Sequence, residues 1–124
     1  MNIEEIIKQE GDHRDFEYKG YKCHIHRNKS MHFLCGYVEV PNGNKYYDND
    51  GEDLNVHGGI TWANNYLPYH KDKSDTWILG FDCGHTGDYM RMPHSELFQQ
   101  PQGIYRTVEY VESEIKQLVD QIDN

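Results

Sequence analysis

The sequence predicts a single α+β domain, in which an antiparallel sheet of about four to six strands is packed by a C-terminal amphipathic helix and accompanied by a short N-terminal helix. Two patterns lead to this class. Apolar and polar residues alternate in the first third of the chain, whereas the last segment places apolar residues at helical spacing. At 124 residues the chain fits one core, which would bury roughly two-thirds of the unfolded surface. We therefore expect one domain spanning residues 1–124.

The first ten residues predict the short helix. Asn2 followed by Glu5 resembles a capping box, and Ile3, Ile6 and Ile7 share one helical face. Gly11 then ends the helix.

Strands follow in the next segment. Residues 16–27 alternate with period two and are interrupted at Lys19-Gly20, a pattern that predicts a hairpin. Residues 33–40 predict a third strand, which stops at the dense turn signal of residues 41–44.

The second half of the chain predicts fewer strands and a long helix. Residues 45–55 are polar and acidic and indicate an exposed loop. A strand is expected near residues 59–62, and residues 76–82 have the composition of a buried central strand. Regular structure is then expected to lapse until Tyr105. The apolar residues of the final helix are Val108, Val111, Ile115, Leu118, Val119 and Ile122.

Composition excludes several classes of protein. A formal net charge of −9 argues against binding to duplex DNA or RNA, because that affinity comes from Lys and Arg. No apolar run approaches the roughly 18 residues of a membrane span, and the N-terminus does not resemble a signal peptide, so we expect a cytoplasmic protein without membrane contact. The three cysteines show no CxxC spacing, which indicates neither a disulfide framework nor a structural zinc site.

Two glycine-flanked histidine loops are the candidate functional site. Residues 56–61 (Val-His-Gly-Gly-Ile-Thr) enter one strand and residues 80–88 leave another, so antiparallel pairing would bring the loops to one end of the sheet. Glycines beside polar residues let the backbone approach a ligand. The alternative is that the glycines only build turns and the histidines bond to nearby backbone. The candidate ligand-binding residues are His57, Gly58, Gly59, Thr61, Trp62, Asp82, His85, Thr86, Asp88 and Arg91.

A metal site at the same loops is a second interpretation. His57, Asp82, His85 and Asp88 could bind zinc, manganese or iron and leave a position open for water, as in a metal-dependent hydrolase. Their spacing is not specific to metal sites, and no HExxH motif occurs in the sequence. His24 and His26 belong to an alternating strand, where we expect exposure to solvent. Apart from this optional divalent metal, the cofactor is left unknown by the sequence.

Aromatic residues beside the loops favour a nucleotide. Trp62, Tyr66, Tyr69, Trp77 and Tyr89 flank them, and stacking on such rings while histidines and amides hold phosphate is one way to bind a nucleotide. Core packing is the simpler role for Trp77. Cys83 near His85 would suit a nucleophile and base only if the two side chains faced each other.

The ordered motifs resemble a family of small proteins encoded by phages and prophages. They are residues 36–43, the VHGGIT of residues 56–61, the GFDCGHTGD of residues 80–88 with the Trp-Ile-Leu before it, and Tyr105-Arg106 ahead of residues 110–112. The similarity runs from about residue 33 to the C-terminus. Relatives often carry a histidine where this chain has Asn44, so no role is carried over to that position. The resemblance implies a phage-like origin and highlights the two loops, but it names no reaction.

A phage context favours a protein that acts on the host, in the host cytoplasm. The leading hypothesis is a homo-oligomeric binding protein that sequesters a small anionic molecule such as a nucleotide, in an anti-defence role. A metal-dependent hydrolase using the same residues is the first alternative. The second is an inhibitor that binds a host protein through an acidic face, with the loops purely structural.

Overall fold

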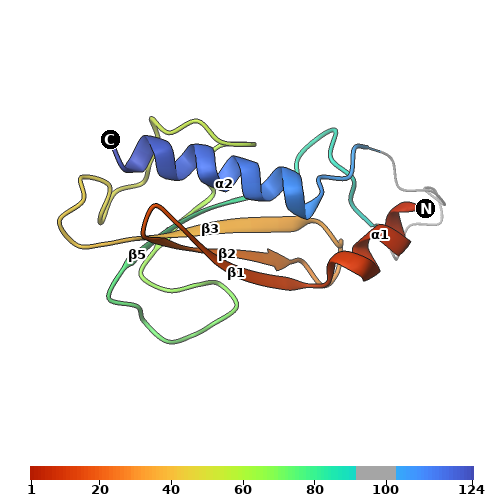
Figure 1. Ribbon diagram of the computed structural model, residues 1–124, viewed down its shortest axis with the longest axis horizontal. Coiled ribbons are helices and arrows are strands. Elements are labelled where there is room, and N and C mark those ends of the chain that lie inside the picture. The colour runs from red at the N-terminus through yellow and green to blue at the C-terminus, as the bar shows by residue number, and fades with distance from the viewer. Residues whose placement is uncertain (92–102) are drawn as a thin grey trace.

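The computed structural model of the protein describes residues 1–91 and 103–124. Over these residues it contains a five-stranded antiparallel sheet with the strand order β1-β2-β3-β5-β4, and a helix at each end of the chain. The predicted α+β class is thereby confirmed (Figure 1). The elements are α1 (Ile3–Glu10), β1 (His13–Tyr18), β2 (Tyr21–Arg27), β3 (Leu34–Val40), β4 (Trp62–Asn64), β5 (Trp77–Asp82) and α2 (Val108–Ile122).

The hairpin of β1 and β2 forms around the predicted two-residue turn. Lys19 and Gly20 have φ angles of 52° and 84°, the left-handed conformation that a tight hairpin turn requires. This turn pairs Tyr18 with Tyr21 and carries the register back to His13 opposite His26. Strand β1 therefore begins three residues before the predicted start at residue 16.

Strand β4 begins later than predicted and is short. Gly58 and Gly59 both have positive φ angles, 70° and 81°, which no strand adopts. The expected strand near residues 59–62 therefore starts only at Trp62, where it pairs antiparallel with Gly80. Strand β5 lies between β3 and β4, which confirms the predicted central strand.

Helix α2 lies along one face of the sheet, above β2 and β3 (Figure 1). All six residues of its predicted apolar stripe are buried. The helix packs closely because Gly36 lacks a side chain: a Cβ atom there would lie 2.6 Å from the Phe81 ring and 2.9 Å from Ile115. The helix begins after Thr107, whose hydroxyl accepts a hydrogen bond from the backbone N–H of Tyr110.

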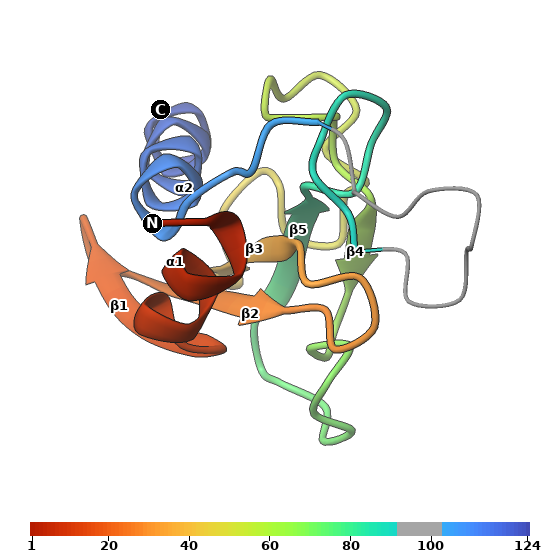
Figure 2. The same cartoon turned by 90° about the vertical axis from the view of Figure 1, so that its right-hand side faces the viewer.

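Helix α1 closes one end of the sheet, near the start of α2 (Figure 2). Its predicted cap is confirmed, since the Asn2 side chain accepts a hydrogen bond from the backbone N–H of Glu5 at 2.9 Å. Glu10 accepts hydrogen bonds from the backbone N–H of Val108 and from the Tyr105 hydroxyl. Arg27 is only 3% exposed and donates to the Tyr105 hydroxyl and to the Gly11 carbonyl, which ties α1, β2 and the segment before α2 together.

The loop of residues 45–55 is less exposed than predicted. Tyr46 and Leu54 are buried and join the core under α2, because apolar side chains in a polar loop can still cover the end of a sheet.

No helix of residues 1–91 and 103–124 has both the length and the apolar character that crossing a membrane requires.

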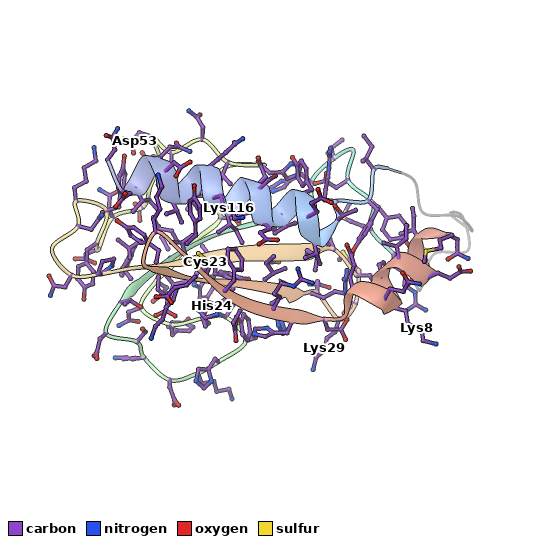
Figure 3. All side chains as sticks on the ribbon, viewed as in Figure 1. Lys8, Cys23, His24, Lys29, Asp53 and Lys116 are labelled. Carbon is purple, nitrogen blue, oxygen red and sulfur yellow. The ribbon has the colours of Figure 1, made fainter. Side chains whose placement is uncertain are left out.

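Over residues 1–91 and 103–124, no helix covers the sheet face opposite α2, and we call this face the open face. Lys116 on α2 and His24 on β2 lie on opposite sides of the sheet (Figure 3). His24 is less exposed than expected, with 14% of its side chain accessible, because Asp15 of β1 and Glu39 of β3 lie against its two ring nitrogens.

Candidate functional site

The two histidine loops meet at one end of the sheet. Antiparallel pairing of β4 with β5 places residues 56–61 beside residues 82–88, and the backbone N–H of Thr61 donates to the Gly80 carbonyl at 2.9 Å. The predicted convergence of the loops is therefore confirmed.

His57 connects this loop end to helix α2. Its Nδ1 lies 2.7 Å from the Tyr110 hydroxyl, its Nε2 lies 2.8 Å from Asp88 Oδ2, and its backbone N–H donates to Glu114. Both ring nitrogens are engaged within the protein. A ligand could use His57 only by displacing one of these partners.

Asp88 is the buried centre of the same network. It is 4% exposed, and its carboxylate accepts from His57, from Arg106 Nε at 2.9 Å and from the backbone N–H of His85 at 3.1 Å. Burial acts to raise the pKa of Asp88, but the hydrogen bonds from His57 and Arg106 outweigh it and lower that pKa. The charge of Asp88 is thus balanced by internal partners, which favours a structural role for the His57–Asp88 pair.

Asp82 and His85 lie on the other side of the loop end. Asp82 accepts hydrogen bonds from the Thr61 hydroxyl and from the backbone N–H of Gly84. His85 Nε2 lies 3.3 Å from Asp82 Oδ1, but the geometry is not that of a hydrogen bond, and the buried nitrogen has no hydrogen-bond partner in the part of the chain that the structure describes. His85 therefore keeps unused hydrogen-bonding capacity.

Gly58 makes room for the His85 ring. A Cβ atom at Gly58 would lie 2.2 Å from His85 Nε2, and φ at this residue is already 70°. The glycine is needed for both reasons, the backbone conformation and the approach of the imidazole.

The remaining candidates are dispersed. Thr86 is exposed beside the loops, whereas Arg91 lies near the turn after β2, with its backbone N–H bonded to Met31 and its side chain 3.3 Å from His32. Trp62 packs edge-on against Tyr66 and donates its indole N–H to the Tyr66 carbonyl. The structure thus places Arg91 apart from the two loops.

A cavity of about 450 Å³ opens beside the first loop. Its lining includes Gly59, Thr61 and Trp62 as well as Asp50 and Glu52 of the acidic loop. We call it the loop-end cavity. Its size lies within the usual range of small-molecule sites. Neither Asp50 nor Glu52 was expected in the site, because a long acidic loop gives no sequence signal of where it folds back.

The four residues of the predicted metal site do not gather around one point. The His57 and His85 rings are 6.1 Å apart, and His57 is bonded to Asp88 whereas His85 lies against Asp82. In residues 1–91 and 103–124, the group close enough for metal binding is His13, Asp15 and His24, on the open face.

Cys83 is unsuited to act as a nucleophile. It is 1% exposed, and burial raises the pKa of its thiol well above the ordinary value.

Comparison with protein-family models, with curated proteins and with solved structures gives no match for this chain. The functional inferences below therefore depend on the geometry of the chain alone.

Proposed function

We propose that this protein binds a small organic molecule in the loop-end cavity, with Trp62 as its aromatic wall. The single observation that carries this proposal is the cavity itself, whose acidic, apolar and aromatic lining comes from two separate segments of the chain, residues 50–54 and 59–63.

The charge of the lining selects the ligand. Asp50 and Glu52 belong to the lining, and Asp82 accepts a hydrogen bond from the Thr61 hydroxyl at 3.0 Å. An anionic phosphate would be repelled by these carboxylates, whereas an organic amine would be attracted to them and could pack on the face of Trp62. We therefore propose a small organic cation rather than the anionic nucleotide that the sequence suggests.

A titration with two kinds of probe tests the proposal. Isothermal titration calorimetry and thermal shift assays would compare a linear polyamine with a panel of nucleotides. We expect the polyamine to bind and to raise the Tm, and the double variant Asp50→Asn, Glu52→Gln to lose most of this affinity. Asp72→Asn is the matched control, because its side chain is exposed and lies outside the cavity lining. Binding of nucleotides instead would reject the cationic ligand and support the anionic one.

A partner protein is the second candidate, and one observation favours it. His57 and Asp88 are fully bonded within the chain, as expected if the loops are structural and recognition takes place elsewhere. If neither probe binds, and if Trp62→Ala leaves activity in cells unchanged, this candidate replaces the small-molecule proposal. The phage-like origin, the anti-defence role and the loop-based hydrolase stay predictions from the sequence.

A further inference from the structure

The open face carries a second group of chemically reactive side chains. On β1, His13 and Asp15 point to this face, and on β2 so do His24 and His26, because residues two apart in a strand share a face. The register places His13 opposite His26 and Asp15 opposite His24. Two adjacent cross-strand pairs thus bring three imidazoles and one carboxylate together.

We propose that His13, Asp15 and His24 bind a divalent transition-metal ion on the open face, at a site separate from the loop-end cavity. Asp15 Oδ1 lies 2.8 Å from His13 Nε2 and 2.6 Å from His24 Nδ1, and the three ligand atoms all lie within 4.8 Å of one another. This proposal does not depend on the function proposed above.

The three atoms need little adjustment to surround an ion. Ligands of a tetrahedral zinc ion stand about 2.1 Å from the metal, and hence about 3.4 Å from one another. Asp15 would have to withdraw from the two rings by less than about 1 Å. Its side chain is 62% exposed and can turn without disturbing the core.

His24 is held in the orientation of a metal ligand. Its Nε2 lies 2.7 Å from Glu39 Oε2, and Glu39 accepts a second hydrogen bond from the Thr76 hydroxyl at 2.8 Å. A carboxylate behind a histidine fixes the tautomer that leaves the other ring nitrogen free for a metal. Glu39 and Thr76 are therefore positioning residues for His24 Nδ1.

The contacts of His24 place a carboxylate at each ring nitrogen. Nδ1 lies 2.6 Å from Asp15 Oδ1, and Nε2 lies 2.7 Å from Glu39 Oε2. A divalent ion between Nδ1 and Asp15 would leave the contact of Nε2 with Glu39 in place.

His13 has a positioning partner of its own. Its Nδ1 lies 3.1 Å from His26 Nδ1, and the His26 ring stacks on Tyr69 with centroids 3.9 Å apart. With His13 Nδ1 donating and His26 Nδ1 accepting, this hydrogen bond fixes the tautomer of His13. Nε2 of His13 is then the nitrogen left for the ion.

A buried hydroxyl beside the cluster has no hydrogen-bond partner among the described residues. It belongs to Tyr69, whose ring also packs edge-on against His13 at 5.4 Å. Burial and the charges of Asp15 and Glu39 raise the pKa of this phenol, so it stays a neutral donor. This hydroxyl is a hydrogen-bond donor that the described residues leave unused.

The ligand set indicates the class of metal. Two imidazole nitrogens and one carboxylate oxygen suit zinc, iron(II) or manganese better than calcium or magnesium. Three protein ligands leave at least one position for water, which distinguishes reactive sites from closed structural ones. A surface cavity of about 360 Å³, lined by Asp15 and His24 among others, gives access to the site.

Zinc titration of the full chain tests the site. After chelator treatment, calorimetry with Zn²⁺ should show one ion per chain. We expect Asp15→Asn and His24→Gln each to weaken binding at least about 100-fold, and Glu39→Gln to weaken it about 10- to 100-fold. His70→Gln, whose side chain is 64% exposed, is the control and should bind like the wild type. Circular dichroism would confirm that each variant folds.

Nitrogen chemical shifts give a readout that does not depend on variants. On addition of Zn²⁺, long-range ¹H–¹⁵N spectra should show large shifts of Nδ1 in His24 and of Nε2 in His13, and a retained proton on Nε2 of His24. Shifts at other nitrogens, or wild-type affinity in Asp15→Asn, would overturn the proposal. Loss of binding in His85→Gln but not in His24→Gln would place the ion at the loops instead.

Discussion

Gly58 shows how a single missing side chain shapes the loop end. We predict that Gly58→Ala destabilises the protein by at least about 2 kcal/mol, because the new methyl group meets the His85 imidazole in a backbone conformation that already disfavours alanine. Urea denaturation would measure the change.

The neighbouring glycine provides the matched control for this prediction. Gly59 has a φ angle of 81°, but a Cβ atom there would meet nothing within 4 Å. Gly59→Ala should therefore lower the free energy of unfolding only by the cost of holding alanine at a positive φ angle, without a steric clash. If both variants lose the same stability, the contact with His85 has no energetic weight.

Asp88 should make stability depend on acid pH. Because its pKa is lowered in the folded state, the stability that it contributes is present above the unfolded pKa, near 3.8, and is lost as the pH falls through the folded value. We expect Asp88→Asn to be less stable than the wild type at neutral pH and to differ less from it in strong acid. Chemical denaturation at both pH values checks this. A constant difference between the two proteins would contradict the ionic role of Asp88.

At the residue scale, sequence reasoning found one cluster and missed the other. The convergence of His57 and Asp88 follows from two strands that pair antiparallel, and this was predictable. The bonding of His57 to Tyr110 was not, because it depends on how α2 crosses the sheet. The His13–Asp15–His24 group had a usable signal: a two-residue turn at Lys19-Gly20 fixes which residues lie opposite one another.

Among the elements, α2 contributes most to the core. We predict that Ile115→Ala lowers the free energy of unfolding by about 3 kcal/mol, because this α2 side chain is fully buried against Gly36 of β3. Gln117→Ala, on the exposed side of the same helix, should change stability by less than about 0.5 kcal/mol. Thermal or urea unfolding of the two variants provides the measurement. Similar losses in both would mean that the helix is only loosely packed.

The elements were predictable to different degrees, for physical reasons. Helix α2 has six buried residues in one stripe, a strong periodic signal that long helices provide. Strand β4 has only three residues, and its start depends on the positive φ angles of Gly58 and Gly59, which sequence periodicity does not reveal. The buried ends of the acidic loop were missed because apolar residues such as Tyr46 and Leu54 stand isolated in a polar segment.

For the whole molecule, the order of the strands predicts where the fold opens first. Strand β3 is paired on both sides and lies under α2, whereas β1 and β4 form the edges of the sheet. In native-state hydrogen exchange we expect the slowest amides in β2, β3 and β5, and faster exchange in β4. Equal protection of β4 and β3 would show that another surface covers the β4 edge.

The same edges bear on the predicted homo-oligomer. Edge strand β1 exposes most of its six residues, and charged side chains such as Arg14 and Glu17 discourage pairing with a second sheet. Light scattering coupled to size exclusion would determine the association state. If a dimer is found, we expect Arg14→Ala to leave it intact. The charged edge of β1 discourages pairing, so the interface should lie on another surface.

The two tryptophans give the molecule an internal optical reporter. Trp62 begins β4 and Trp77 begins β5, and their indole N–H groups donate to the carbonyls of Tyr66 and Asn49. Both belong to the half of the sheet that borders the loop-end cavity, whereas the histidine cluster lies on β1 and β2. Tryptophan fluorescence should therefore change when a ligand occupies the cavity and remain unchanged when zinc binds. One unlabelled sample can then distinguish the two binding events.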